Sequence, residues 1–73
     1  MEEKFIENIA EILEVESDQL SMDTAFKTSE FEWDSLKGYA MIVMIEEEFN
    51  VQISVKKFIE AKTVGDLFQY INH

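Results

Sequence analysis

The sequence lacks several residue types on which small proteins often rely. It contains no cysteine, which excludes disulfides, thiolate metal sites and a thiol nucleophile. Its one histidine is the terminal residue, so a paired-histidine zinc site is excluded and a Ser–His catalytic pair is disfavoured. There is no proline, and the only glycines are Gly38 and Gly65. This scarcity excludes a glycine-rich phosphate loop and disfavours a turn-rich β fold.

Long apolar runs are also missing. No stretch approaches the roughly 18 apolar residues needed to cross a bilayer, so we expect no membrane insertion. The start Met1-Glu2-Glu3 is acidic, whereas a secretory signal peptide begins with positive charge. A chain of 73 residues has room for one small domain, which we expect to occupy residues 1–73.

Negative charge is the strongest feature of the composition. Sixteen Asp and Glu residues face six Lys residues, which gives a formal net charge of −10. The excess lies in residues 1–29 and 30–53, whereas residues 54–73 are slightly basic. Such a chain repels nucleic acid and attracts proteins with basic surfaces, although acidity that only keeps a small domain in solution would look the same. Hydrophobic residues make up 47% of the chain, too many for a disordered acidic tail.

Helical periodicity appears in the first and last parts of the chain. Residues 3–14 place apolar side chains on one face, which predicts an amphipathic helix. Residues 63–72 repeat the pattern, and Thr63 and Asp66 have the spacing of a capping box. The apolar positions are Phe5, Ile6, Ile9, Ile12 and Leu13 in the first stretch and Val64, Leu67, Phe68 and Ile71 in the last.

A third helix is predicted over residues 35–50, with Asp34 as its N-cap. Its middle is apolar almost all round, and a helical wheel separates two stripes. The first stripe is expected to face the core, and spacing alone leaves the second as either further core or a partner surface. The first consists of Gly38, Met41, Ile42, Ile45 and Phe49, and the second of Leu36, Tyr39 and Val43.

The remaining segments predict connections and one short helix. Residues 15–33 are rich in turn and cap formers, which indicates a long loop across the core with a short helical turn at residues 17–20. Residues 54–61 predict a short helix capped by Ser54, with Phe58 and Ile59 turned inward. A strand over residues 51–55 would have no partner. The expected fold is an all-α bundle of three longer helices and one short helix, with the long loop between the first and second.

No side chain has the partners that catalysis requires, so we expect the protein not to be an enzyme. The serines have no candidate base, which makes a hydrolase the weakest hypothesis. Residues 46–48 are all Glu but lack the spacing of a calcium loop, so we expect weak divalent binding and no dedicated metal site. Ser35 stands out only by position, at the positive end of a helix dipole where an attached phosphate would be stabilised. Taken alone, Asp34-Ser35-Leu36 is also an ordinary capping sequence.

Several segments together resemble the acyl carrier proteins of the phosphopantetheine-binding carrier family. The resemblance extends over essentially the whole chain, and the order and spacing of the segments follow the family. The segments are Trp33-Asp34-Ser35-Leu36, Ile45-Glu46-Glu47-Glu48-Phe49, Val51-Gln52-Ile53 and Lys62-Thr63-Val64-Gly65-Asp66-Leu67.

The resemblance implies a four-helix acyl carrier with 4′-phosphopantetheine joined to Ser35 as a phosphodiester, beside Asp34 and Leu36. A separate phosphopantetheinyl transferase would install this arm from coenzyme A, and its thiol would carry acyl groups as thioesters. The implied partners are that transferase and acyl-loading, acyl-transferring or condensing enzymes with basic docking surfaces. The implied setting is the cytoplasm of a bacterium, and the protein is expected to be a monomer.

Departures from the family pattern bear on the pathway. Phe31-Glu32-Trp33 replaces the usual Leu-Gly and small residue, and Lys37 and Ala40 stand where fatty-acid carriers usually have acids. These differences favour a specialised fatty-acid, polyketide or other biosynthetic pathway. The alternatives are an aminoacyl or peptidyl carrier and, from another class, an acidic interaction module or nucleic-acid mimic.

Two surfaces are expected to serve the carrier function. The docking stripe is Leu36, Tyr39 and Val43, with Glu46 and Glu47 on either side and Glu48 well away from it. By resemblance, an acyl chain would enter between the second helix and the short third one. Its lining would include Met41, Ile45, Phe49, Ile53, Phe58 and Ile59.

Overall fold

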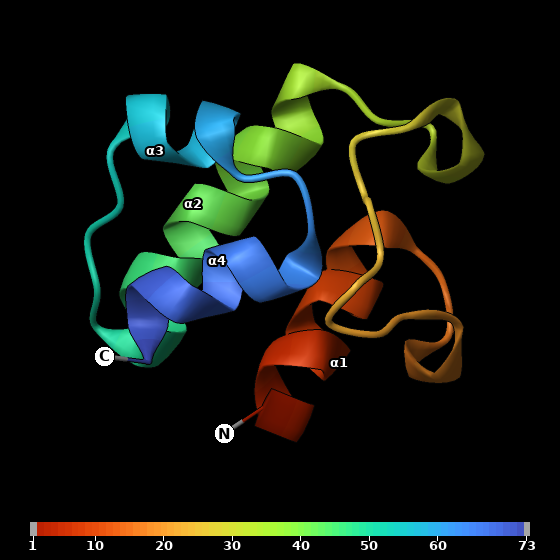
Figure 1. The fold of residues 1–73 in the computed structure, drawn as a ribbon, viewed down its shortest axis with the longest axis horizontal. Helices are drawn as coiled ribbons and strands as arrows, with labels where there is room; N and C mark the ends of the chain where they lie inside the picture. The colour runs from red at the N-terminus through yellow and green to blue at the C-terminus, as the bar shows by residue number, and fades with distance from the viewer. Residues whose placement is uncertain (1, 73) are drawn as a thin grey trace.

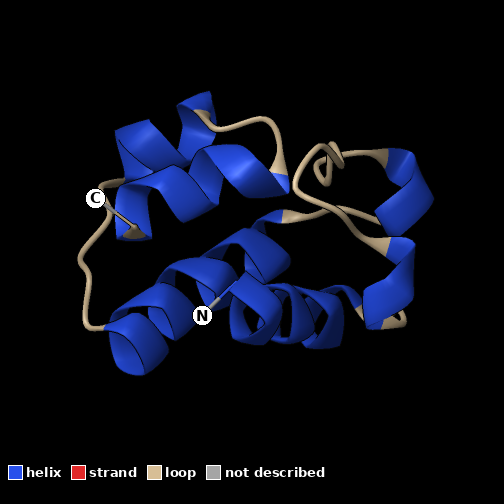
Figure 2. Cartoon of the chain, turned by 60° about the horizontal axis from the view of Figure 1, so that its bottom comes forward, coloured by secondary structure: helices blue, strands red, loops and turns tan. Residues whose placement is uncertain are grey.

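The computed structural model describes residues 2–72, which form four α-helices and two short 3-10 helices (Figure 1). Figure 2 shows that α1 and α2 lie in one layer, α3 and α4 in the other, and the long loop at one end. Apart from one isolated bridge between Ala25 and Thr63, the described residues contain no β pairing. The expected all-α bundle is confirmed. The helices are α1 (Glu2–Leu13), η1 (Ser17–Gln19), η2 (Ser29–Phe31), α2 (Ser35–Phe49), α3 (Val55–Glu60) and α4 (Val64–Ile71).

Side-chain caps fix where three of the helices begin. The Asp34 carboxylate accepts a hydrogen bond from the Lys37 amide at 2.9 Å, so the predicted N-cap of α2 is confirmed. Ser54 caps α3 in the same way. At α4, the Thr63 hydroxyl accepts from the Asp66 amide while Asp66 accepts from the Thr63 amide, which confirms the capping box.

The core lies between the two layers. Phe5 on α1 is fully buried, and its ring contacts Phe49 and Phe68 at centroid distances of 5.6 and 5.5 Å. The predicted core stripe of α2 is confirmed at its centre, whereas Ile42 and Phe49 are only half-buried. The largest fully buried side chains are Phe5, Ile9, Phe26, Met41, Ile45, Val64 and Leu67.

The long loop is held down by backbone contacts as well as by apolar side chains. The Val64 amide donates to Thr24 O at 3.0 Å, and the Gly65 amide donates to Met22 O at 2.7 Å. These bonds fasten the middle of the loop to the start of α4. The short turn predicted at residues 17–20 is confirmed as η1, while η2 was not predicted.

One inward position in α3 was wrongly predicted. Phe58 is buried, but the adjacent Ile59 is 67% exposed. Successive residues on a helix point about 100° apart, and in α3 it is Phe58 that faces the core while Ile59 points to solvent. Within residues 2–72, none of the helices combines the length and apolarity that a membrane span requires.

Candidate functional site

Ser35 is the first residue of α2, directly after its N-cap. Its side chain is exposed, and within residues 2–72 its hydroxyl makes no hydrogen bond, because Asp34 already supplies the cap. The amides of the first turn and the positive end of the dipole of a 15-residue helix lie beside this hydroxyl. A phosphate ester at this position would be stabilised without loss of the cap.

A mostly apolar groove begins at Ser35 and runs between α2 and α3; we call it the Ser35 groove. Its volume is about 470 Å³, within the range of small-molecule sites. It is lined by Lys27, Trp33, Ser35, Gly38, Tyr39, Ile42, Val55, Phe58 and Ile59.

Stacked aromatic rings form part of this lining. The Trp33 indole stacks on the Phe58 ring, with centroids 6.1 Å apart and planes at 23°. Phe26, fully buried, meets the indole edge-on at 5.3 Å. A side-chain carbon at Gly38 would lie 3.2 Å from Phe58 Cε2 and 3.3 Å from Trp33 Cζ2. The glycine therefore lets both rings approach α2 closely.

Lys27 is the only ionised side chain in the lining of the Ser35 groove. Its ammonium donates hydrogen bonds to Phe58 O at 2.6 Å and to Ile59 O at 3.1 Å, and lies 4.7 Å from the Phe58 ring centroid. Partial burial lowers the pKa of Lys27. Sequence reasoning missed this residue, because its partners lie 31 and 32 positions away and no local pattern links them.

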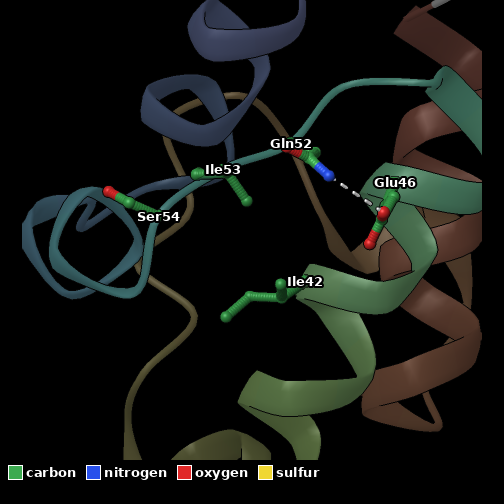
Figure 3. Close-up of a pocket in the computed structure, with 5 residues that line it drawn as sticks. All are labelled: Ile42, Glu46, Gln52, Ile53 and Ser54. Carbon is green, nitrogen blue, oxygen red and sulfur yellow. Dashed lines mark hydrogen bonds between the residues drawn. The ribbon is translucent and has the colours of Figure 1, made fainter.

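A second depression, the Glu46 pocket, continues along α2 (Figure 3). Ile42 borders both hollows, and Ile42 and Ile53 converge on the space between α2 and the chain before α3. Gln52 Nε2 donates to Glu46 Oε2 at 3.4 Å and closes one end. The pocket has a volume of about 400 Å³.

These hollows differ from the acyl-chain lining expected by resemblance. Met41 and Ile45 are fully buried, and Phe49 packs against Phe5. Of the six expected residues, Phe58 and Ile59 line the Ser35 groove and Ile53 lines the Glu46 pocket. The open space therefore lies nearer the surface, between α2 and α3, than the resemblance implied.

The docking stripe is only partly exposed. Leu36 and Tyr39 are 77% and 69% exposed, so the domain core does not use them. Val43 is half-buried in a depression against α1, where it lies with Tyr39 and Glu47. Glu46 borders its own pocket on the α3 side instead.

Glu48 lies apart from both hollows. Its carboxylate faces the Lys4 ammonium at 3.6 Å, with both side chains about half exposed. Glu46, Glu47 and Glu48 thus occupy three different surroundings, as the wheel predicted. Within residues 2–72, no group of acidic residues is placed to hold a metal ion.

Comparison with known proteins identifies the family. The family described as "Phosphopantetheine attachment site" matches residues 3–71. An acyl carrier protein from Treponema pallidum is 36% identical over 63 residues, covering 86% of this chain and 80% of the relative. An acyl carrier protein from Porphyromonas gingivalis is 32% identical over 71 residues, which cover 97% of this chain and 90% of the relative.

These matches define a phosphopantetheine-bearing carrier. The chain belongs to the acyl carrier protein family, which confirms the resemblance seen in the sequence. Members of this family are carriers and not enzymes, and they hold a covalently attached 4′-phosphopantetheine. The family also implies interaction with a phosphopantetheinyl transferase and with biosynthetic enzymes.

Proposed function

We propose that Ser35 bears the 4′-phosphopantetheine arm and that the protein carries acyl groups for a specialised biosynthetic pathway. The observation that carries the proposal is the Ser35 hydroxyl, which is exposed, free of intramolecular hydrogen bonds and placed at the start of α2. The arm would supply the thiol that the sequence lacks, and acyl groups would be held on it as thioesters.

In the attachment reaction this chain would supply the nucleophile and the transferase would supply the base. Ser35 Oγ would bond to the pantetheine-side phosphorus of coenzyme A as the pyrophosphate bond breaks and adenosine 3′,5′-bisphosphate leaves. The serine proton would pass to a base of the transferase, because the neighbouring carboxylate of Asp34 is engaged in capping α2. Asp34 would hold the helix start, whose dipole stabilises the phosphodiester.

The exposed side of α2 would receive partner enzymes. Leu36 lies beside the attachment point and Tyr39 one turn further, so an enzyme that reaches the arm would cover both. Val43 completes the docking stripe, and the carboxylates of Glu46 and Glu47 would steer basic enzyme surfaces towards it.

The specialised role is supported by what replaces the usual acids. The Lys37 ammonium donates to Phe31 O at 3.2 Å and Glu32 O at 2.8 Å, so it holds the segment before Ser35. A partner that requires acids at positions 37 and 40 would find Lys37 and Ala40 there. The carrier would act as a monomer in the cytoplasm of a bacterium, and the bacterial origin of the relatives supports the bacterial setting. Family membership favours a carrier over an acidic decoy.

Intact mass measures the attachment directly. The protein is incubated with coenzyme A, Mg²⁺ and a broad-specificity phosphopantetheinyl transferase. We expect the wild type and Ser29→Ala, a control at another exposed serine, to gain one arm. Ser35→Ala is expected to fold, since Asp34 keeps the cap, and to gain nothing. Addition of the arm to Ser35→Ala would overturn the assignment.

A further inference from the structure

The Ser35 groove holds a positive charge without a negative partner. Within residues 2–72, Lys27 forms no ion pair, and its nearest polar partners are the carbonyls of Phe58 and Ile59. Carbonyl dipoles satisfy two of the three N–H groups of an ammonium but do not neutralise its charge. The net charge of the ammonium is therefore unbalanced by the described side chains, and an anionic ligand that enters the groove can pair with it.

The remaining lining is suited to a different kind of group. Trp33, Phe58 and Ile42 contribute aromatic and aliphatic surface to the same groove as the lysine. A chain that filled this space with a methyl end would desolvate the ammonium further and give it no acceptor. An amine end would add like charge. A chain that ends in a hydrogen-bond acceptor, and best in an anionic one, suits both the apolar lining and the Lys27 ammonium.

We propose that the Ser35 groove takes an acyl group with an apolar stem and a carboxylate at its far end, paired with the Lys27 ammonium. This inference rests on the proposed attachment of the arm to Ser35. Because the arm would be joined at the edge of the groove, its cargo can turn back into it. The cargo class would then be the half-thioesters of dicarboxylic acids.

The overall charge of the molecule makes the proposal testable through salt. A net charge of −10 repels a carboxylate at long range, whereas contact with Lys27 acts in a partly desolvated site. Added salt screens the long-range term more than the contact. The preference for a carboxylate end should therefore persist or grow as salt is added.

The experiment compares acyl ends of matched length on the arm of the full chain. The arm is loaded with hexanoyl, adipoyl or ε-aminocaproyl groups, and thermal unfolding is measured together with the amide resonances of Phe58 and Ile59. We expect adipoyl to raise the melting temperature above that of hexanoyl by ~4 °C or more. We also expect adipoyl to shift both resonances. ε-Aminocaproyl should give the lowest melting temperature of the three.

Variants identify the lysine responsible. Lys27→Met should abolish the difference between adipoyl and hexanoyl, and Lys27→Arg should keep it. Because the two cargoes are compared within each variant, any loss of stability from the substitution itself cancels. Lys57→Met is the matched control, since that ammonium lies 5.6 Å from the Tyr70 ring and outside the groove.

The outcomes separate the two proposals. Failure of Ser35 to accept the arm would overturn both. An arm on Ser35 with equal effects of adipoyl and hexanoyl would overturn only the carboxylate inference. The same holds if Lys27→Met preserves the difference, or if ε-aminocaproyl stabilises most, which would point instead to the Glu46 pocket.

Discussion

The Trp33 indole lies flat against the Phe58 ring, with centroids 6.1 Å apart, so the residue two places before Ser35 packs on the short helix α3. Gly38 is the position on α2 that this stack approaches. The start of α2, the end of the long loop and α3 are therefore joined through two rings. Any change in the spacing of this stack should be visible in the emission of the only tryptophan.

Replacement of Gly38 tests the close approach of the stack. Gly→Ala inside a helix ordinarily stabilises by about 1 kcal/mol. In Gly38→Ala we expect that gain to be lost, because the new carbon would lie 3.2 Å from Phe58 and 3.3 Å from Trp33. Urea unfolding followed by Trp33 fluorescence measures both effects. Full stabilisation with unchanged emission would contradict the crowding argument.

Gly65→Ala should be more damaging than Gly38→Ala. A side-chain carbon at position 65 would lie 2.9 Å from Met22 O, the backbone atom that also accepts the Gly65 amide. A backbone carbonyl cannot turn aside as a ring can, so the loop must shift away from α4. We expect a loss of about 1–3 kcal/mol in the free energy of unfolding. A stability equal to that of Gly38→Ala would show that the loop yields freely.

The capping box of α4 should contribute to the free energy of unfolding in a way that depends on pH. Hydrogen bonds from the Lys62 amide, then from the Thr63 amide, lower the pKa of Asp66 below its ordinary value of 3.8. The folded state therefore binds fewer protons there than the unfolded state. Its contribution is complete above pH 3.8 and is lost as the pH falls through the lowered pKa.

Asp66→Asn isolates this component from the other carboxylates. The free energy of unfolding is measured for the wild type and the variant from neutral pH downwards. We expect the wild type to be the more stable at neutral pH and its advantage to shrink below pH 3.8. An advantage that is constant with pH would mean that Asp66 acts only through its shape.

Screening should stabilise the protein at neutral pH. Ten excess negative charges on 73 residues repel one another, most strongly at low ionic strength. We expect the melting temperature to rise with added NaCl and to rise more per mole with MgCl₂. A melting temperature that responds to neither salt would show that the charges are too well separated to matter.

Charge reversal along α2 tests the docking stripe. Glu47 lies with Tyr39 and Val43, so Glu47→Lys should slow transfer of the arm to Ser35 by ~10-fold. Val43→Asp should also slow it. Glu48→Lys is the matched control, because it makes the same change of charge on another side and loses only an exposed pair with Lys4.

Single-turnover rates with one transferase compare these variants, and thermal unfolding shows that each is folded. Equal slowing by Glu47→Lys and Glu48→Lys would mean that only total charge matters. The docking stripe would then have to be abandoned.

Local signals in the sequence predicted most of the fold. Asp34, Ser54 and Thr63 each cap a helix within three residues of the amide that they bind, so the helix starts were readable from short segments. The position of Ser35 followed from the same cap. The amphipathic faces of α1 and α4 followed from side-chain periodicity.

Features that depend on contacts between residues far apart in the sequence could not be predicted from it. Lys27 looks like any surface lysine until α3 brings two carbonyls to it, and nothing near Gly65 in the sequence points to Met22. α3 has six residues, too few for periodicity to decide between Phe58 and Ile59. Val43 is half-buried because α1 lies beside it, which a wheel of α2 alone cannot show.

Three helical segments end on residues in the left-handed region, and none of these is glycine: Glu14, Glu32 and Asn50 have φ of 63°, 50° and 59°. Asparagine tolerates this region, but each glutamate costs roughly 1 kcal/mol there. A glutamate codon becomes a glycine codon by one nucleotide change. At positions 14 and 32 such a change would relax the backbone and remove a negative charge together. Single substitutions at these two positions could therefore stabilise the fold. Such a gain would offset the loss of stability from substitutions around the Ser35 groove.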